Sequence, residues 1–197
     1  IADQGFGVSV LTKSDLILRD IDLLSQINRR GKAVVCTTLT TYDEDLCRLL
    51  EPNVCTTRRR FEMLRAMKDA GVRTGVWLCP TLPFLTDTEE NLRGLLDYCL
   101  DAGVGVIVHF GMGLTLRDGN RQYFYDRLDQ LFPGMKSRYV RAFGGRYHCV
   151  SPNAARLTGI LRGFCRRHGI VCGSDSALAW LAEFEDPQAG CQLSLFS

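Results

Sequence analysis

The residues of this sequence that could do chemistry follow four apolar segments, and Lys13 is the most distinctive of them. It stands between Thr12 and Ser14, directly after an apolar run. An ammonium group flanked by two hydroxyl groups can hold a carboxylate through charge-assisted hydrogen bonds. The sequence therefore offers Lys13 and Ser14 as ligand-binding candidates, and a solvated lysine at the start of a helix is the alternative.

Hydroxyl groups also follow the second apolar segment. Thr38 and Thr40 belong to the run Thr-Thr-Leu-Thr-Thr at residues 37–41. If this segment and the one before Lys13 form neighbouring strands, the threonine hydroxyls can share a ligand with the lysine. Threonine is also common in strands because it is β-branched, so a structural role is the alternative.

The other two apolar segments end in residues that expose backbone groups. Pro80 opens the stretch Pro-Thr-Leu-Pro, and His109 is followed by Phe-Gly-Met-Gly. A Gly-x-Gly sequence can open an anion-binding nest, or it can form a simple turn. A histidine on an apolar strand can be a chemical group, or a core residue with its hydrogen bonds satisfied.

The elements that must position these residues repeat along the chain as helix, glycine and apolar strand. Near-continuous apolar runs favour parallel strands covered on both faces, and glycine suits the residue after a helix end. The pattern predicts strands at residues 8–11, 33–36, 76–79 and 106–109. Helical patterns lie at residues 16–28, 43–50, 59–69 and 87–101.

Four strand–helix units predict an α/β fold, either an open sheet or part of an incomplete barrel. After residue 113 the sequence predicts mostly helices, at residues 123–132, 135–143, 153–168 and 175–184, with a short strand at 170–172. A polar tail follows. Because no linker is evident, we expect residues 1–197 to form one domain. In parallel α/β folds ligands bind at the carboxyl ends of the strands, where the candidate residues stand.

Composition excludes several classes of protein. The chain is 46% hydrophobic and 23% charged, with a net charge of +2, as in an ordinary globular protein. No apolar run approaches the roughly 20 residues that cross a bilayer, so no membrane partner is expected. The first residues do not resemble a signal peptide. Since the chain does not begin with Met, residue 1 need not be the natural start.

Nine cysteines are spread along the chain, at positions 36, 47, 55, 79, 99, 149, 165, 172 and 191. No two have the Cys-x-x-Cys spacing of a metal or redox motif. A chain of this length without a signal peptide does not suggest a disulfide scaffold. We therefore expect a reduced, cytoplasmic protein with no metal site of its own.

An ordered set of short segments resembles the radical S-adenosylmethionine (SAM) proteins related to spore photoproduct lyase, often described as DNA-repair photolyase-like. The similarity spans nearly the whole chain, and it rests on the order of the segments. They are residues 10–20 (VLTKSDLILRD), 38–41 (TLTT), 50–52 (LEP), 60–62 (RFE), 80–87 (PTLPFLTD), 145–153 (GRYHCVSPN) and 193–196 (LSLF).

This resemblance implies the C-terminal part of a partial (β/α)6 TIM-type barrel. Residues 1–113 would be its third to sixth units, and residues 114–197 a mostly helical extension. It also implies SAM bound to a [4Fe–4S] cluster, whose reductive cleavage gives a 5′-deoxyadenosyl radical. Lys13 and Thr38 match positions that bind the polar groups of SAM, with Thr38 standing where spore photoproduct lyase has a serine. Pro80 would approach the adenine, and an electron donor such as flavodoxin or ferredoxin would be a partner.

The chain departs from the family in one respect. It contains no Cys-x-x-x-Cys-x-x-Cys segment, which in the family provides three thiolates to the cluster. The resemblance places these ligands upstream of residue 1. The chain is then a fragment of a longer enzyme or a degenerate member, and it is inactive by itself.

A substrate site is suggested by bases interleaved with aromatics. Lys136, Arg138, Tyr139 and Arg141 could follow a phosphate backbone and stack on bases, as in a DNA-repair enzyme. An amphipathic helix with solvated arginines is the alternative. Cys149 could donate a hydrogen atom to a substrate radical, or it could be a buried structural thiol.

Two other functions stay open at this point. One is a nucleic-acid-binding module without catalysis, which would use the basic residues near position 140. The other is a Schiff-base lyase in which the amine of Lys13 attacks a carbonyl substrate, although no acid–base partner is evident.

Overall fold

A five-stranded parallel sheet forms the centre of the computed structural model, which describes residues 2–183. The strand order β1-β2-β3-β4-β7 follows the chain, and every neighbouring pair is parallel. The strands are β1 (Val8–Leu11), β2 (Ala33–Thr38), β3 (Arg73–Trp77), β4 (Val106–Val108) and β7 (Val171–Cys172). This mixed α/β architecture agrees with the predicted fold class and is compatible with part of a TIM-type barrel.

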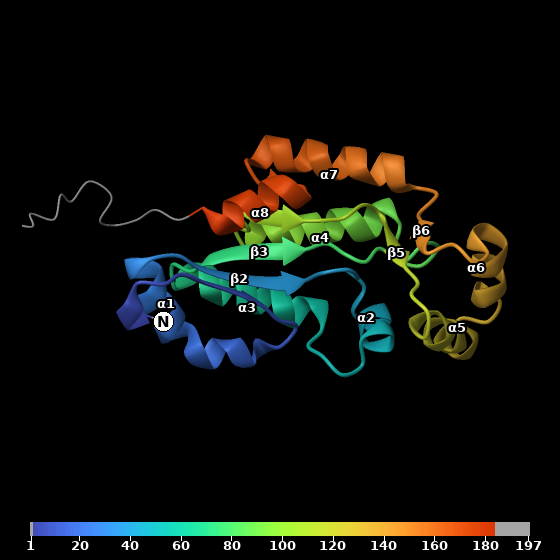
Figure 1. Cartoon of the computed structure of the whole chain (residues 1–197), viewed down its shortest axis with the longest axis horizontal. Helices are drawn as coiled ribbons and strands as arrows, with labels where there is room; N and C mark the ends of the chain where they lie inside the picture. The colour runs from blue at the N-terminus through green and yellow to red at the C-terminus, as the bar shows by residue number, and fades with distance from the viewer. Residues whose placement is uncertain (1, 184–197) are drawn as a thin grey trace, which may run out of the picture.

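Helices connect the strands and cover one face of the sheet (Figure 1). Short 3-10 helices precede β1 and follow it, at η1 (Ala2–Gln4) and η2 (Asp15–Asp20). The α-helices of these connections are α1 (Ile21–Arg30), α2 (Glu44–Leu50), α3 (Thr57–Asp69) and α4 (Glu89–Asp101), and α7 (Ala154–His168) packs beside α4.

Local capping explains where these helices begin. The side chains of Asp43, Thr56 and Thr88 accept hydrogen bonds from backbone N–H groups in the first turns of α2, α3 and α4. Such N-caps satisfy donors that have no partner within the helix. After α3 and α4 the chain turns at Gly71 and Gly103, where φ is +77° and +58°, as the glycine pattern predicts.

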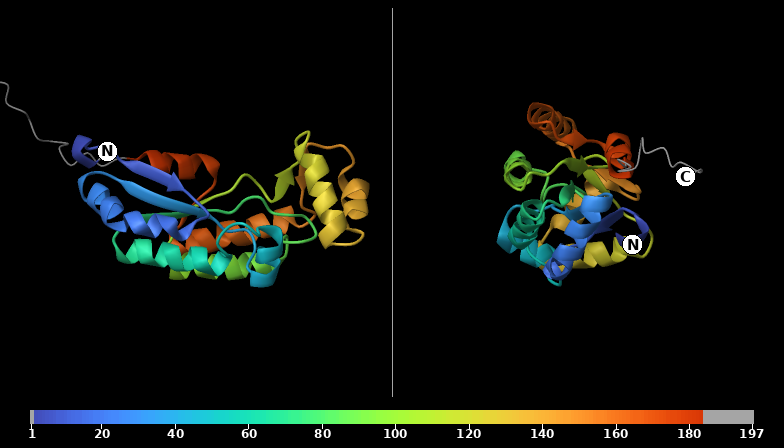
Figure 2. Two further views of the ribbon diagram at one scale, coloured as in Figure 1. Left: turned by 90° about the horizontal axis from the view of Figure 1, so that it is seen from below. Right: turned by 90° about the vertical axis from the view of Figure 1, so that its left-hand side faces the viewer.

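The two faces of the sheet have different partners. Ala33 and Val35 on β2 pack with α1 and α3, so the alternate residues Val34 and Cys36 face the other side. On that other side α8 (Ser174–Ala182) covers β4 and β7, with Ala177 packed against the two valines of β4. Figure 2 shows α8 across the sheet from α3 and α4.

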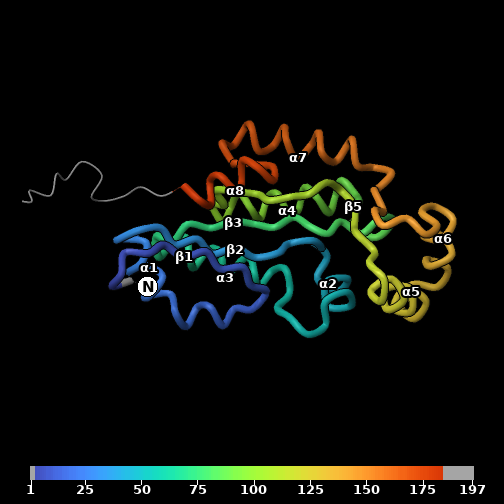
Figure 3. The backbone as a smooth tube through the Cα atoms, viewed as in Figure 1, coloured from blue at the N-terminus to red at the C-terminus, as the bar shows by residue number. Residues whose placement is uncertain are grey.

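A separate unit lies beyond the carboxyl ends of the strands (Figure 1). It contains α5 (Asn120–Leu131), α6 (Met135–Phe143) and an antiparallel pair formed by β5 (Gly113–Thr115) and β6 (His148–Val150). Figure 3 shows the chain leaving β4, passing through these two helices and returning to α7. This unit has an apolar cluster of its own, which includes Leu116, Tyr125, Leu128 and Tyr139.

The structure confirms the four predicted strands and the short fifth strand, and it changes some details. The predicted helix at residues 16–28 is divided into η2 and α1, and β3 begins three residues earlier than expected. The sequence predicts a mostly helical extension and does not predict the two short strands β5 and β6 that the structure has there. Residues 193–196 and the end of the predicted helix at residue 184 lie outside the described residues. Between residues 2 and 183, no helix has the length and apolar character to span a membrane.

Candidate ligand-binding site at the strand ends

The ends of β1 and β2 lie side by side. Leu11 pairs with Cys36, and Thr12 donates its backbone N–H to the Cys36 carbonyl at 3.0 Å. Lys13 therefore follows a strand whose neighbour ends at Thr38. The sequence-based expectation that these two residues share one edge of the sheet agrees with this register.

Glu51 is the residue that organises this edge, and the sequence indicates it only as part of the family-like segment 50–52, without a role of its own. One oxygen of its carboxylate accepts a hydrogen bond from the Lys13 ammonium. The other accepts one from Nη2 of Arg60 at 2.5 Å. The same guanidinium donates through Nη1 to the Thr38 carbonyl at 2.8 Å. Lys13 and the end of β2 are thus joined through two intermediate side chains.

The hydrogen bonds from Lys13 and Arg60 favour the ionised form of Glu51. The Arg60 side chain is fully buried, and that of Glu51 is 15% exposed. Burial acts to raise the pKa of Glu51, but the hydrogen bonds from Lys13 and Arg60 outweigh it, so the pKa lies below its usual value. With one negative and two positive charges, the group carries a net positive charge.

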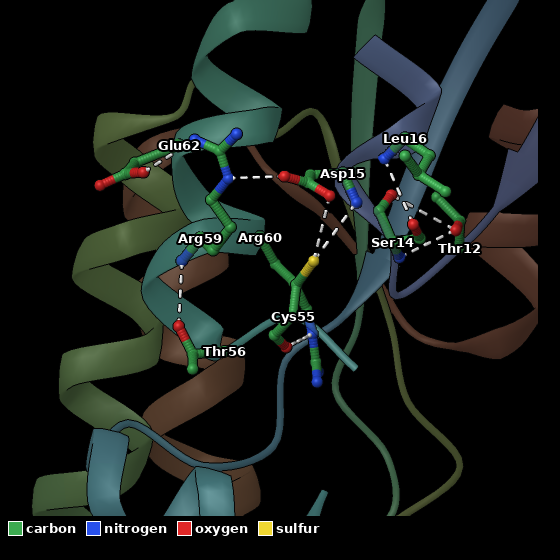
Figure 4. Close-up of polar contacts among 9 residues, drawn as sticks. All are labelled: Thr12, Ser14, Asp15, Leu16, Cys55, Thr56, Arg59, Arg60 and Glu62. Carbon is green, nitrogen blue, oxygen red and sulfur yellow. Dashed lines mark hydrogen bonds and ion pairs between the residues drawn. The ribbon is translucent and has the colours of Figure 1, made fainter. Parts of the chain in front are cut away.

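A second network holds the loop after β1 against the start of α3 (Figure 4). The carboxylate of Asp15 accepts a hydrogen bond from Nε of Arg59 at 2.7 Å and from the Cys55 thiol at 3.3 Å. Cys55 also donates its backbone N–H to the Lys13 carbonyl, and its own carbonyl accepts from Nε of Arg60. The backbone of Lys13 is therefore fixed as well as its ammonium.

A cavity of about 260 Å³ opens beside the Lys13–Glu51 pair. Thr40 and Pro80 line it from the strand side, and α5 closes it with apolar and aromatic residues such as Phe124. Three predicted site residues, Lys13, Thr40 and Pro80, therefore line the same cavity.

Two predicted residues do not line this cavity. The hydroxyl of Ser14 caps η2 by accepting the backbone N–H of Leu16 at 3.2 Å. Thr38 is buried beside the cavity with 8% of its surface exposed, and its carbonyl rather than its hydroxyl has the contact to Arg60. Their roles in ligand binding stay predictions.

A larger cavity of about 630 Å³ lies between the ends of β3 and β4 and the β5–β6 pair. Pro80 borders both cavities, so they are neighbours. Phe110, which is 62% exposed, lines the larger one, and its ring lies 5.7 Å from that of Trp77. The larger cavity is mostly apolar and has room for a small-molecule ligand.

Cys149 also lines the larger cavity, from β6. Its residue surface is fully buried, and burial raises the pKa of the thiol. The sulfur therefore carries its hydrogen at neutral pH. Its distance to the carbonyl oxygen of Arg146 is 3.9 Å. The Cys149 thiol, which is the candidate hydrogen donor, therefore lies in the wall of this cavity in its protonated form.

The predicted nucleic-acid surface is only partly present. Arg138 and Arg141 are exposed on α6, while Lys136 forms an ion pair with Asp129 at 2.8 Å. Tyr139 is fully buried, and its hydroxyl donates to the Pro83 carbonyl at 2.7 Å. The interpretation of Tyr139 as a base-stacking residue is therefore wrong, because its ring belongs to the apolar core around α5 and α6.

No group of three or more cysteine, histidine or acidic side chains that could hold a metal ion occurs within residues 2–183. Cys191 lies outside this range. Within the described part of the chain, the residues present therefore do not fit a [4Fe–4S] cluster, which takes three or four thiolates.

Comparison with known sequences shows similarity to proteins without assigned functions. No family model matches the chain. The uncharacterized protein Rv2578c of Mycobacterium tuberculosis is 33% identical over 139 residues, which are 71% of this chain and 40% of that protein. ORF301 of Acidianus two-tailed virus is 29% identical over 122 residues, which are 60% and 39%. The chain spans about 40% of the length of these relatives.

Comparison with solved structures shows a shared fold. A spore photoproduct lyase mutant with bound AdoMet (SAM) and dinucleoside spore photoproduct matches with a TM-score of 0.58 at 13% sequence identity. The match covers 84% of this chain and 49% of that one. A second structure of the lyase, complexed with dinucleoside spore photoproduct, gives a TM-score of 0.56. The chain therefore shares the fold of about half of the spore photoproduct lyase chain.

Proposed function

We propose that this chain is part of a radical SAM enzyme and forms one side of its SAM-binding surface. The observation that carries the proposal is the Lys13–Glu51 pair at the edge of a cavity, at the carboxyl ends of parallel strands. The fold shared with spore photoproduct lyase supports it.

The residues at this edge fit the chemistry of SAM. Its methionyl end carries a carboxylate and an ammonium group, which are complementary to Lys13 and Glu51 respectively. The hydroxyl of Thr40 adds a hydrogen-bonding group in the same hollow, and Pro80 offers an apolar surface at the boundary of both cavities. Thr38 and Ser14 do not line this cavity, and their part in SAM binding is proposed only from their proximity to Lys13 and Thr40 in the sequence.

The proposal includes an iron–sulfur cluster, and the residues that would hold it lie upstream of residue 1. SAM supplies hydrogen-abstracting radical chemistry when it is bound to such a cluster. This chain would bind the methionyl end, orient it through the fixed loop after β1, and enclose the reacting groups beneath α5. Flavodoxin or ferredoxin would be the electron donor.

The larger cavity is the proposed substrate site, and a DNA lesion is the proposed substrate. Phe110 offers an exposed ring to a base, and Cys149 lines the same cavity. The solved lyase structures contain a dinucleoside photoproduct, which supports this substrate class.

The decisive experiment uses the longer protein. We expect the codons upstream of residue 1 to encode Cys-x-x-x-Cys-x-x-Cys, and the anaerobically reconstituted protein to form 5′-deoxyadenosine from SAM and a reductant. A matched variant with Lys13→Ala should keep its iron content and lose most of this product. A gene that starts at residue 1, or product formation unchanged by Lys13→Ala, would overturn the proposal.

A nucleic-acid-binding module is the second candidate, and the exposed residues Arg138 and Arg141 favour it, with the guanidinium of Arg138 lying 4.0 Å from the centre of the Phe84 ring. The Schiff-base alternative gains no support from the geometry. Lys13 is engaged in an ion pair with Glu51, whereas an amine that attacks a carbonyl must be neutral.

A further inference from the structure

A histidine, a tyrosine and an arginine form a connected row beside the larger cavity. His148 lines this cavity from β6, and its ring lies 4.7 Å from the ring of Tyr147. The Tyr147 hydroxyl accepts a hydrogen bond from Nε of Arg117 at 3.2 Å. We propose that Arg117 and Tyr147 bind the phosphate group of a nucleotide whose base occupies the larger cavity. This inference rests on the proposed function, which makes that cavity the substrate site.

Pairing of β5 with β6 brings these residues together. Thr115 pairs with His148, and both line the cavity. Leu116 then donates its backbone N–H to the Tyr147 carbonyl at 2.8 Å, which extends the pairing by one residue. Arg117 follows directly, so the arginine and the tyrosine stand at the same end of the paired strands, next to the cavity wall.

A second arginine fixes the backbone of this site. Arg121 on α5 donates through Nη2 to the carbonyls of Leu116, Gly145 and Arg146 at 3.0–3.1 Å. Two of these carbonyls belong to the residues that directly precede the arginine and the tyrosine of the proposed site. A site whose backbone is held before the ligand arrives loses less conformational freedom on binding.

Arg117 keeps the donors that a phosphate needs. Within residues 2–183, its guanidinium has no hydrogen bond other than the one from Nε to Tyr147. The two terminal nitrogens can therefore donate to two oxygens of one phosphate, which is the bidentate geometry that guanidinium groups favour. Because the Tyr147 hydroxyl uses an acceptor position for Arg117, its own proton can be donated to the same phosphate.

The charge of Arg117 also favours an anionic ligand. On the helices that cover the sheet, several exposed arginines form ion pairs with acidic side chains, and they include Arg48, Arg58, Arg59 and Arg93. Arg117 is exposed as well, but in the described part of the chain it forms no ion pair, even with the adjacent Asp118. Its positive charge is therefore available to a ligand in the cavity beside it.

Together, the cavity and the row beside it fit a nucleotide better than a free base or a nucleoside. The apolar cavity and the exposed ring of Phe110 suit an aromatic base. Arg117 and Tyr147 suit the charged group that lies outside the base. In DNA that group is the phosphodiester, which carries one negative charge for each nucleotide.

The test compares two ligands that differ in one charge. Thymidylyl-thymidine contains a phosphodiester, and its methylphosphonate analogue has an uncharged linkage in the same place. Nuclear magnetic resonance titration of the whole 197-residue chain at low salt measures both dissociation constants. We expect the phosphodiester to bind about tenfold more tightly, at the lower end of what a charge-assisted hydrogen bond contributes, because Arg117 is exposed.

Three variants assign this preference to the site. Arg117→Gln should reduce it to less than about twofold and leave the affinity for the methylphosphonate unchanged. Tyr147→Phe keeps the ring, removes the hydroxyl and should reduce the preference to about threefold. Arg167→Gln, which removes an exposed arginine from α7, is the matched control and should keep the full preference. Circular dichroism shows whether each variant is folded.

Three results would overturn the inference. Equal affinity of the natural sequence for the two ligands would show that no phosphate is recognised, and it would leave the cavity as the proposed substrate site. An equal loss of preference in Arg167→Gln would assign the effect to overall charge. Binding of neither ligand would contradict the proposed substrate cavity, and the phosphate site with it. The radical SAM assignment is tested separately, through 5′-deoxyadenosine formation by the longer protein.

Discussion

The ammonium of Lys13 and the carboxylate of Glu51 form an ion pair at the edge of the smaller cavity. Side chains 38 positions apart meet here because β1 ends beside β2, and α2, which follows β2, ends just before Glu51. Arg60 holds the other oxygen of the same carboxylate, so Glu51 is fixed from two sides.

The first prediction concerns SAM binding by the reconstituted longer protein. Replacing Lys13 by Met removes a charge-assisted hydrogen bond, which contributes about 1.5–3 kcal/mol, so the dissociation constant should rise roughly 10–150-fold. Isothermal titration calorimetry would measure it. Lys136→Met, which removes a lysine paired on α6, is the matched control and should leave affinity unchanged. Equal affinity for the two variants would contradict the assignment of Lys13.

Arg60 carries a prediction about stability. Arg60→Met leaves the Glu51 carboxylate, which is 15% exposed, with one partner fewer, and breaking a buried pair in this way costs about 3–5 kcal/mol. Urea unfolding of the whole chain would measure the loss. The double variant Arg60→Met/Glu51→Gln should recover part of it, because the charge that then loses its partner, the Lys13 ammonium, is 36% exposed to solvent. Arg58→Met, at an exposed position, should change stability by under about 0.5 kcal/mol.

Acid should weaken the fold through Glu51. Its pKa is below the usual 4.5, so the stability it contributes is fully present above pH 4.5 and is lost as the pH falls through its folded-state pKa. Unfolding free energies measured between pH 6 and pH 3 should therefore fall less steeply in Glu51→Gln than in the natural sequence. Parallel curves for the two proteins would show that Glu51 has an ordinary pKa in the fold.

Much of the sheet was predictable, because a buried parallel strand needs a continuous apolar run and the glycines mark the helix ends. The pair β5 and β6 was not, since each strand has only three residues and its partner lies more than 30 residues away. The misplaced start of β3 has a local reason. Gly75 indicates a turn by composition, yet in the structure it lies within the strand.

For the site, the sequence identified the residues at the strand ends but not what holds them. Glu51 and Arg60 stand in loop and helix patterns that give no sign of a shared ion pair, because their contact depends on how α2 and α3 fold back. The interpretation of Tyr139 as a base-stacking residue is wrong for a related reason. An aromatic between basic residues can face either way on a helix, and only the packing of α5 on α6 decides it.

Gly75 itself gives a fourth prediction. A Cβ at this position would lie 2.7 Å from the Cys36 sulfur and 2.8 Å from a methyl carbon of Val106, so alanine overpacks the sheet. We expect Gly75→Ala to lower the unfolding free energy by about 1–3 kcal/mol. Gly163→Ala, within α7 and with open space around it, is the matched control and should raise stability by about 0.5–1 kcal/mol. A neutral Gly75→Ala would mean that β2, β3 and β4 are less closely packed than described.

The last prediction separates the basic surface from the core beneath it on α6. Arg138→Ala and Arg141→Ala together remove two exposed charges, so any binding of single-stranded DNA should weaken and its dependence on salt should become shallower. Tyr139→Phe should leave DNA affinity unchanged, because the ring is buried, and should lower stability by about 1–3 kcal/mol by leaving the Pro83 carbonyl without its donor. Fluorescence anisotropy over a range of salt concentrations and urea unfolding measure the two effects. A loss of DNA affinity in a fully folded Tyr139→Phe variant would show that the Tyr139 hydroxyl contributes to DNA binding, which its burial excludes.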